Sequence, residues 1–135
     1  MRIMGLDIGT KRIGIALSDE SGTIAQAKEV ILRKSDKKAV SKIIEMVREF
    51  KVKEIVVGLP IHMDGTEGAR AKDSIKFAEE LKKNTAVHVD MWDERLSTRE
   101  AEGVLLEASM SRAKRKKVID KVAAQIILQG YLDSR

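Results

Sequence analysis

The sequence MRIMGLDIGTKRIGIALSD, residues 1–19, holds two apolar runs on either side of the short turn GTKR. Residues 3–8 and 13–18 have the composition of β-strands, and a short turn with a glycine between two such runs predicts a hairpin. One carboxylate, Asp7, lies inside the first run with apolar neighbours on both sides. Burying an unpaired carboxylate costs several kcal/mol, so this acid requires a partner.

The rest of the chain alternates between short apolar runs and amphipathic stretches. In chain order, the pattern predicts strands at 3–8, 13–18 and 27–32, a helix from a cap at Ser35 or Asp36 to about 50, a strand at 54–60, a helix ending near 83, a strand at 86–92, a helix at 97–108 and a helix at 118–132. The basic stretch at 109–117 is expected to be a flexible connection. This order predicts one α/β domain over residues 1–135, a mixed sheet covered by helices.

Length and composition limit the class of protein. A chain of 135 residues with 43% hydrophobic residues fits a single domain with a proper core. No apolar run approaches the roughly 20 residues that cross a bilayer, and the first residues do not resemble a signal peptide. The absence of cysteine excludes disulfides, iron–sulfur clusters and thiolate zinc sites. We therefore expect a cytoplasmic protein with no membrane partner.

The net charge of +5 permits binding to nucleic acid without proving it. Aromatic residues make up only 3% of the chain, which argues against a surface that stacks on unpaired bases.

Acids occur in three unusual local contexts. Asp7 lies within a strand, Asp93 and Glu94 directly follow another strand, and Asp120 lies among apolar residues near the start of the last predicted helix. Ligand sites of open α/β sheets lie at the ends of strands. Three such acids together suggest that they gather around a cation.

Each acid also has an ordinary explanation. Asp7 could accept a hydrogen bond from a hairpin amide, and Glu94 could pair with Arg95. Asp120 could stabilise a helix N-terminus, where negative charge is favourable. The cation site therefore depends on all three acids together.

The type of ligand indicates the metal. Carboxylate oxygens suit Mg²⁺ or Mn²⁺, and two histidines without cysteine argue against zinc. His62 and His88 are interpreted as a loop residue and a strand-face residue. A carboxylate cluster in a basic protein points to phosphoryl chemistry, in which paired metals activate a water and stabilise the leaving oxygen.

Basic residues that could contact phosphate occur in two places. One group precedes the last predicted helix, where cations oppose the helix dipole, and comprises Arg112, Lys114, Arg115, Lys116 and Lys117. The other is Lys11 and Arg12, in the turn after Asp7. The first group could instead be a disordered, solvated loop, and Lys11 and Arg12 could equally be simple exposed turn residues.

The loop IHMDGTEG, residues 61–68, could hold a phosphate through the backbone amides around Gly65 and Gly68 and the hydroxyl of Thr66. The Asp64–Gly65 pair could instead form only a turn. Trp92 is interpreted as a packing anchor.

Four segments, GLDIGTKRIGIALSD, GLPIHMDGTEG, DERLST and IDKVAAQIILQGYL, resemble in order the signature blocks of the YqgF (RuvX) family. The resemblance covers residues 4–132. It implies a ribonuclease H-like fold with a five-stranded mixed sheet whose second strand is antiparallel. It also implies a divalent-metal-dependent nuclease, associated with processing the 5′ end of the 16S ribosomal RNA precursor and described as a Holliday junction resolvase homologue.

Position by position, the resemblance assigns the metal-binding and catalytic acids to Asp7, Glu94 and Asp120. Asp93 is an ambiguous neighbour, and the motif favours Glu94. His62 and Ala69 depart from the pattern, where Asn and Pro are common. Both departures concern loop contacts rather than the acids.

The expected function is an endonuclease that processes the ribosomal RNA precursor, with two metal ions when substrate is bound. Alternatives are a Holliday junction resolvase, which requires a dimer for two symmetric cuts, and a non-catalytic RNA-binding assembly factor. A third, an actin-like ATPase using the first block to hold phosphate, would need two such domains. The chain is expected to be a monomer or a homodimer.

Overall fold

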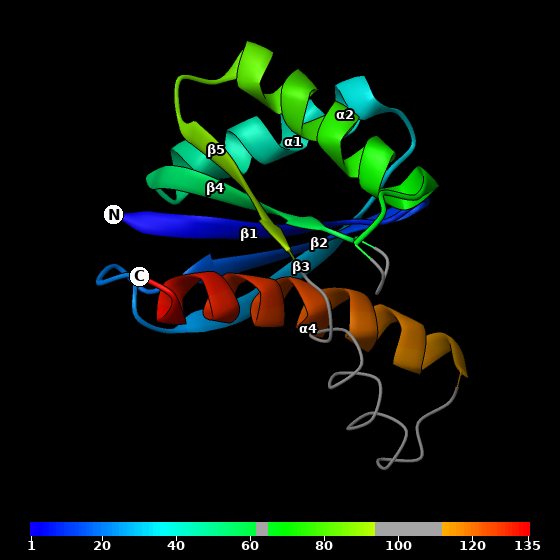
Figure 1. The fold of residues 1–135 in the computed structure, drawn as a ribbon. Coiled ribbons are helices and arrows are strands. Elements are labelled where there is room, and N and C mark those ends of the chain that lie inside the picture. The colour runs from blue at the N-terminus through cyan, green and yellow to red at the C-terminus, as the bar shows by residue number, and fades with distance from the viewer. Residues whose placement is uncertain (62–64, 94–111) are drawn as a thin grey trace.

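The computed structural model describes residues 1–61, 65–93 and 112–135, with side chains for all of these except 112–121. The elements are β1 (Arg2–Ile8), β2 (Arg12–Ser18), β3 (Ala25–Leu32), α1 (Asp36–Glu49), β4 (Val52–Leu59), α2 (Ala69–Asn84), β5 (His88–Asp93) and α4 (Arg112–Asp133). Figure 1 shows helices on both sides of one sheet. The helix predicted at 97–108 lies outside the described residues.

The five strands form one sheet in the order β3-β2-β1-β4-β5. β1 pairs parallel with β4, and β4 with β5, whereas β2 runs antiparallel to both β1 and β3. The predicted mixed sheet with an antiparallel second strand is therefore confirmed. β1, which carries Asp7, is the central strand.

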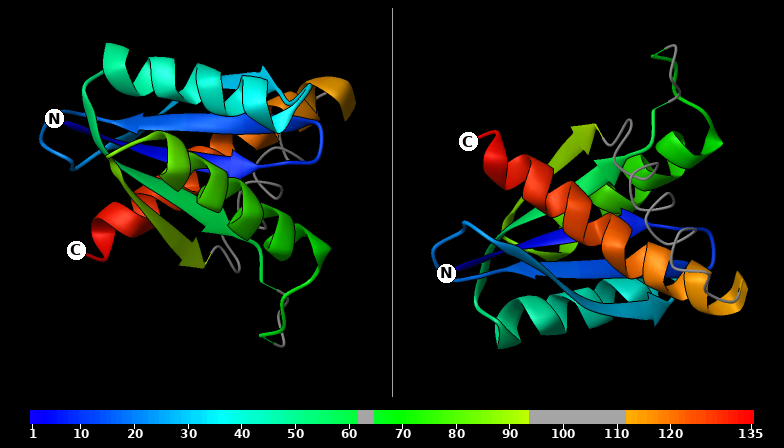
Figure 2. Two further views of the ribbon diagram at one scale, coloured as in Figure 1. Left: turned by 90° about the horizontal axis from the view of Figure 1, so that it is seen from above. Right: turned by 90° about the horizontal axis from the view of Figure 1, so that it is seen from below.

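Each face of the sheet has its own apolar cluster. Met4, Leu6 and Ile8 of β1 pack in the cluster with residues of α1 and α2, whereas Ile3 packs in the cluster with residues of α4. Figure 2 shows α4 crossing the sheet on the face opposite α1. Because successive strand residues point to opposite faces, Asp7 shares the α4 face with Ile3.

Helix α4 lies very close to β1 at Gly5. A Cβ added there would lie 2.7 Å from the Cβ of Leu128 and 3.1 Å from the carbonyl oxygen of Ala124. Both chain termini lie at the same end of the molecule, so α4 runs antiparallel to β1 (Figure 1). The first turns of α4 therefore lie toward the Asp7 end of β1.

The start of α1 follows the prediction, because the Ser35 side chain caps it by accepting a hydrogen bond of 3.2 Å from the backbone N–H of Lys38. In α2, Phe77 and Ser74 are buried, whereas Ile75 is only partly buried. Among the helices that the structure describes, none is long and apolar enough to cross a membrane.

The last helix begins earlier than predicted. α4 starts at Arg112, so residues 112–117 are helical and the expected flexible connection there is wrong. The physical reason is that Arg, Ala and Lys are strong helix formers. Asp120 lies about two turns inside the helix, too far from its start for the helix dipole to explain the acid.

Candidate active site

The candidate site is built around Asp7, near the carboxyl end of the central strand. Its side chain is only 12% exposed, and its neighbours Leu6 and Ile8 are fully buried on the opposite face. β2 pairs with it on one side through Gly14, and β4 borders β1 on the other. The sheet therefore holds this carboxylate in a fixed position.

The turn after β1 requires glycine. The N–H of Gly9 donates a 2.8 Å hydrogen bond to the carbonyl of Arg12, and a Cβ at Gly9 would lie 2.5 Å from that oxygen. The tight turn places Lys11 exposed and Arg12 half-buried, beyond the end of β1. Both predicted phosphate-binding residues thus follow Asp7 directly at the same edge of the sheet.

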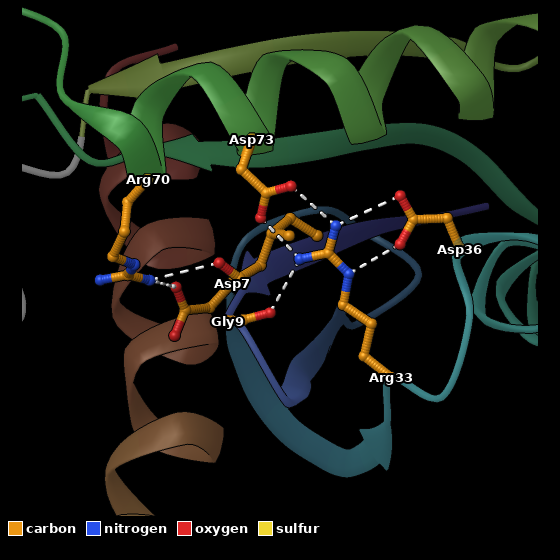
Figure 3. Close-up of polar contacts among 7 residues, drawn as sticks. Asp7, Gly9, Arg33, Asp36, Arg70 and Asp73 are labelled. Atoms are coloured by element: carbon orange, nitrogen blue, oxygen red, sulfur yellow. Dashed lines mark hydrogen bonds and ion pairs between the residues drawn. The ribbon is translucent and has the colours of Figure 1, made fainter.

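Arg70 reaches Asp7 from the first turn of α2. Its Nη2 lies 3.7 Å from Oδ1 of Asp7 and donates a 3.2 Å hydrogen bond to the carbonyl oxygen of Ile8 (Figure 3). The Arg70 side chain is 56% exposed. Arg70 was not among the residues predicted from the sequence, although a cation at a helix N-terminus is the signal that singled out residues 112–117.

Arg33, at the same edge, is almost completely enclosed, with 8% of its side chain exposed. It donates to Asp36 at 2.8 and 3.3 Å, to Asp73 at 2.6 and 2.9 Å, and to the Gly9 carbonyl at 3.0 Å. These contacts use all five guanidinium N–H donors. They join β1 to the starts of α1 and α2 (Figure 3).

The Arg33 cluster changes the acidity of its members. The hydrogen bonds from Arg33 hold the pKa of Asp73 below its usual value, although partial burial opposes this. The two carboxylates raise the pKa of Arg33, and Asp73 contributes more to this rise than Asp36 does. Arg33 is therefore a permanent cation whose charge is balanced within the fold.

The loop before α2 is described from Gly65 onward, and His62 and Asp64 lie outside the described residues. Gly65 has a φ of 89°, a left-handed conformation that favours glycine. Gly68 is the N-cap of α2 and provides no side-chain cap. Thr66 is exposed, and its binding of phosphate stays a prediction.

The predicted site residues differ in how much of each one the structure describes. Asp7 is described fully, Glu94 lies outside the described residues, and Asp120 is described only as part of the backbone of α4. The basic group is likewise described only as backbone, and comprises Arg112, Lys114, Arg115, Lys116 and Lys117. Within the part of the chain with described side chains, no three carboxylate or histidine groups gather as a metal site.

Trp92 is a packing residue, as the sequence predicted. Its ring meets Tyr131 of α4 edge-on, with centroids 5.9 Å apart and planes at 85°. The Tyr131 hydroxyl donates to Glu54 of β4, which raises the pKa of Tyr131 to about 12. Trp92 thus faces α4, whereas Val89 packs in the cluster on the other face.

This arrangement of sheet, helices and Asp7 can be compared with known proteins. The family model described as "RuvX: Holliday junction resolvase" matches residues 1–134. The chain belongs to the RuvX family.

Curated RuvX relatives match over nearly their whole length. A protein of Symbiobacterium thermophilum is 55% identical over 135 residues, covering 100% of this chain and 94% of the relative. One of Syntrophomonas wolfei is 53% identical over 133 residues, covering 98% and 94%. Both carry the name "Putative pre-16S rRNA nuclease".

Solved structures share the fold of this RuvX chain at low identity. The fowlpox virus Holliday junction resolvase gives a TM-score of 0.62 at 14% identity and covers 99% of each chain. The T. thermophilus RuvC in complex with a Holliday junction substrate gives 0.58 at 15% identity, covering 100% of this chain and 95% of that one. The predicted ribonuclease H-like fold is confirmed.

Proposed function

We propose that the chain is a divalent-metal-dependent endonuclease that hydrolyses a phosphodiester bond at the 5′ end of the 16S ribosomal RNA precursor. The name shared by relatives of more than 50% identity supports the substrate. Such a substrate implies a cytoplasmic location and no membrane partner.

The observation that carries this proposal is the nearly buried carboxylate of Asp7 near the carboxyl end of the central strand. An apolar side chain would pack better there, because burying a carboxylate is unfavourable. The fold nevertheless holds a carboxylate, with Arg70 as an ion-pair partner, at the edge of the sheet where ligands of α/β folds bind. A metal ligand with a fixed position accounts for this placement.

The proposed metal ligands are Asp7, Glu94 and Asp120, which would hold Mg²⁺ or Mn²⁺ through oxygen atoms. Position 120 precedes Ala124 by one helical turn, and Ala124 packs against β1 at Gly5. In β5 the α4 face carries Trp92, so alternation favours Glu94 over Asp93 for the face of Asp7. All three carboxylates suit a hard cation.

Two such ions, when bound, supply an activated water and stabilise the oxygen that leaves. The chain itself must fix the carboxylates and hold the nucleic-acid backbone. For backbone binding we propose residues around the Asp7 edge, namely Lys11, Arg12, Thr66, Arg112, Lys114, Arg115, Lys116 and Lys117. The helical conformation of residues 112–117 favours this, because it puts those cations on the first turns of α4.

The test is a side-by-side cleavage assay in Mn²⁺. One reaction contains an RNA that spans the 5′ end of the mature 16S sequence, and the other a four-way DNA junction. Each substrate is also given to the Asp7→Asn variant. We expect cleavage of the RNA, lost in the variant. An Asp7→Asn enzyme with full activity would refute the assignment of the site.

A second candidate function is resolution of Holliday junctions, favoured by the description of the family and by the two resolvase structures. Symmetric cutting of the junction, together with a dimer in solution, would establish it. Binding of RNA without cleavage of either substrate would instead indicate a non-catalytic assembly factor. For RNA processing we expect a monomer to suffice.

A further inference from the structure

A pocket of about 460 Å³ lies beside Asp7 and has no role in the metal site proposed above. It opens between the end of β3, the start of α1 and the start of α2. Its lining comprises Thr10, Arg33, Lys34, Ser35, Asp36, Ala69, Arg70 and Asp73. Arg70 belongs both to this pocket and to the ion pair with Asp7, so the pocket and the candidate active site are contiguous.

The charge of the pocket is positive once its internal pairs are accounted for. Arg33 donates four hydrogen bonds to the carboxylates of Asp36 and Asp73, and these three groups together carry a charge of −1. The other charged groups of the lining are Arg70 and Lys34, which bring its sum to +1. Lys34 is exposed and forms no ion pair with the described residues.

The two helices that start at the pocket differ in a way that also favours an anion. Ser35 caps α1, and Asp36 adds an acid to its first turn. The N-cap of α2 is Gly68, which has no capping side chain, and its first turn contains no acid. Arg70 in that turn is a cation where the helix dipole disfavours one. An anion bound here would relieve this unfavourable placement.

We propose that this pocket binds a backbone phosphate of the substrate strand, next to the bond cleaved at Asp7, and that Arg70 and Lys34 are its ligands. The guanidinium of Arg70 would exchange Asp7 for phosphate when a cation occupies the carboxylate. A planar fork of donors suits bidentate binding of phosphate. The inference deepens the proposed nuclease function and rests on it.

The experiment measures binding rather than cleavage. Asp7→Asn protein, which is expected not to cut, is titrated into a fluorescein-labelled oligouridylate of about 12 nucleotides, without divalent metal, at several salt concentrations. Fluorescence anisotropy gives the Kd at each salt concentration. For a single strand, each phosphate contact contributes about 0.7 to the slope of log Kd against log salt.

We expect Arg70→Ala and Lys34→Ala, each in this background, to lower that slope by about 0.7 and to weaken binding about tenfold at low salt. Arg70→Lys should restore the slope but only part of the affinity, because it keeps the charge and loses the fork. The matched control is Arg48→Ala, which removes an exposed arginine from the last turn of α1. The control should leave the slope unchanged.

An unchanged slope in Arg70→Ala, or an equal decrease in Arg48→Ala, would overturn the proposal. If Arg70→Ala lowers the thermal midpoint, Arg70→Gln replaces it, because the amide can still donate to the carbonyl of Ile8. Failure of the nuclease proposal would appear separately, as an absence of cleavage by the parent chain in Mn²⁺. The binding slopes remain interpretable in that case.

Discussion

Arg33 and Arg70 lie at the same edge of the sheet and differ in almost every other respect. Arg33 is enclosed and uses all five donors on the protein itself. Arg70 is more than half exposed and, among the residues that the structure describes, makes one hydrogen bond to a carbonyl and a long ion pair to Asp7. The same residue type therefore serves the fold at one position and is available to a ligand at the other. The saturation of its donors, rather than its charge, separates the two roles.

The largest expected effect concerns the functional side of this comparison. Asp7→Asn should reduce metal-dependent cleavage by about a thousandfold or more, because the variant loses the charge of the carboxylate that we propose as a metal ligand. Its stability to urea should not fall, since the amide is isosteric and a buried charge has been removed. Cleavage rates and urea midpoints of the two proteins test this. A large loss of stability would show that Asp7, like Arg33, stabilises the fold.

The second prediction concerns the structural side. Arg33→Met should lower the free energy of unfolding by about 3 kcal/mol, because two carboxylates lose their shared partner in a partly buried site. Arg70→Met is the matched control and should change it by less than about 1 kcal/mol, as expected for an exposed pair. Urea denaturation of both variants measures the difference. Equal losses would break the comparison between the two arginines.

A third prediction concerns the close packing of α4 on β1. Gly5→Ala should destabilise the fold by about 2 kcal/mol, because the new methyl group would lie 2.7 Å from the Cβ of Leu128. The helix must then move, and Asp120 with it, so cleavage should fall by more than stability alone explains. The control is Gly130→Ala in α4, where the new Cβ would lie 3.2 Å from Nε1 of Trp92. If both variants lose activity equally, the close contact of α4 with Gly5 has no particular importance for cleavage.

The smallest expected effect is a dependence on pH. The hydrogen bonds from Arg33 lower the pKa of Asp73, so the folded state favours the ionised form. That contribution is complete above the unfolded pKa of about 3.9, and it is lost as the pH falls through the lower folded value. Thermal midpoints from pH 6 downward should therefore decline less in Asp73→Asn than in the parent. Parallel curves would show that Arg33 does not perturb Asp73.

The sequence predicted the hairpin of β1 and β2 and singled out Asp7, because both depend on neighbours within a few residues. The order of the five strands, with its one antiparallel strand, was implied by the resemblance to the RuvX family. An acid inside an apolar run is visible without any structure. The Arg33 cluster was not predictable in this way, because Gly9, Asp36 and Asp73 come together only when β1, α1 and α2 pack. Arg70 was also missed, although it is a cation in the first turn of a helix, because its contact with Asp7 forms only when α2 packs beside β1.

The misplaced start of α4 has a simple cause. A dense run of Arg and Lys is typical of both a solvated loop and an exposed helical turn, and charge alone does not distinguish them. Trp92, in contrast, was interpreted correctly as a packing residue, because a large aromatic side chain beside an apolar strand contributes much contact area to the core.

The Arg33 cluster also affects how the native protein opens. Because one guanidinium holds the beginnings of α1 and α2 to the end of β1, neither helix start can open without breaking the same set of bonds. Local opening of the two helices is thereby coupled into one cooperative unit. Backbone amides in their second turns, which are hydrogen-bonded within the helix, should exchange with solvent deuterium at matching opening free energies, although the helices are separate in sequence.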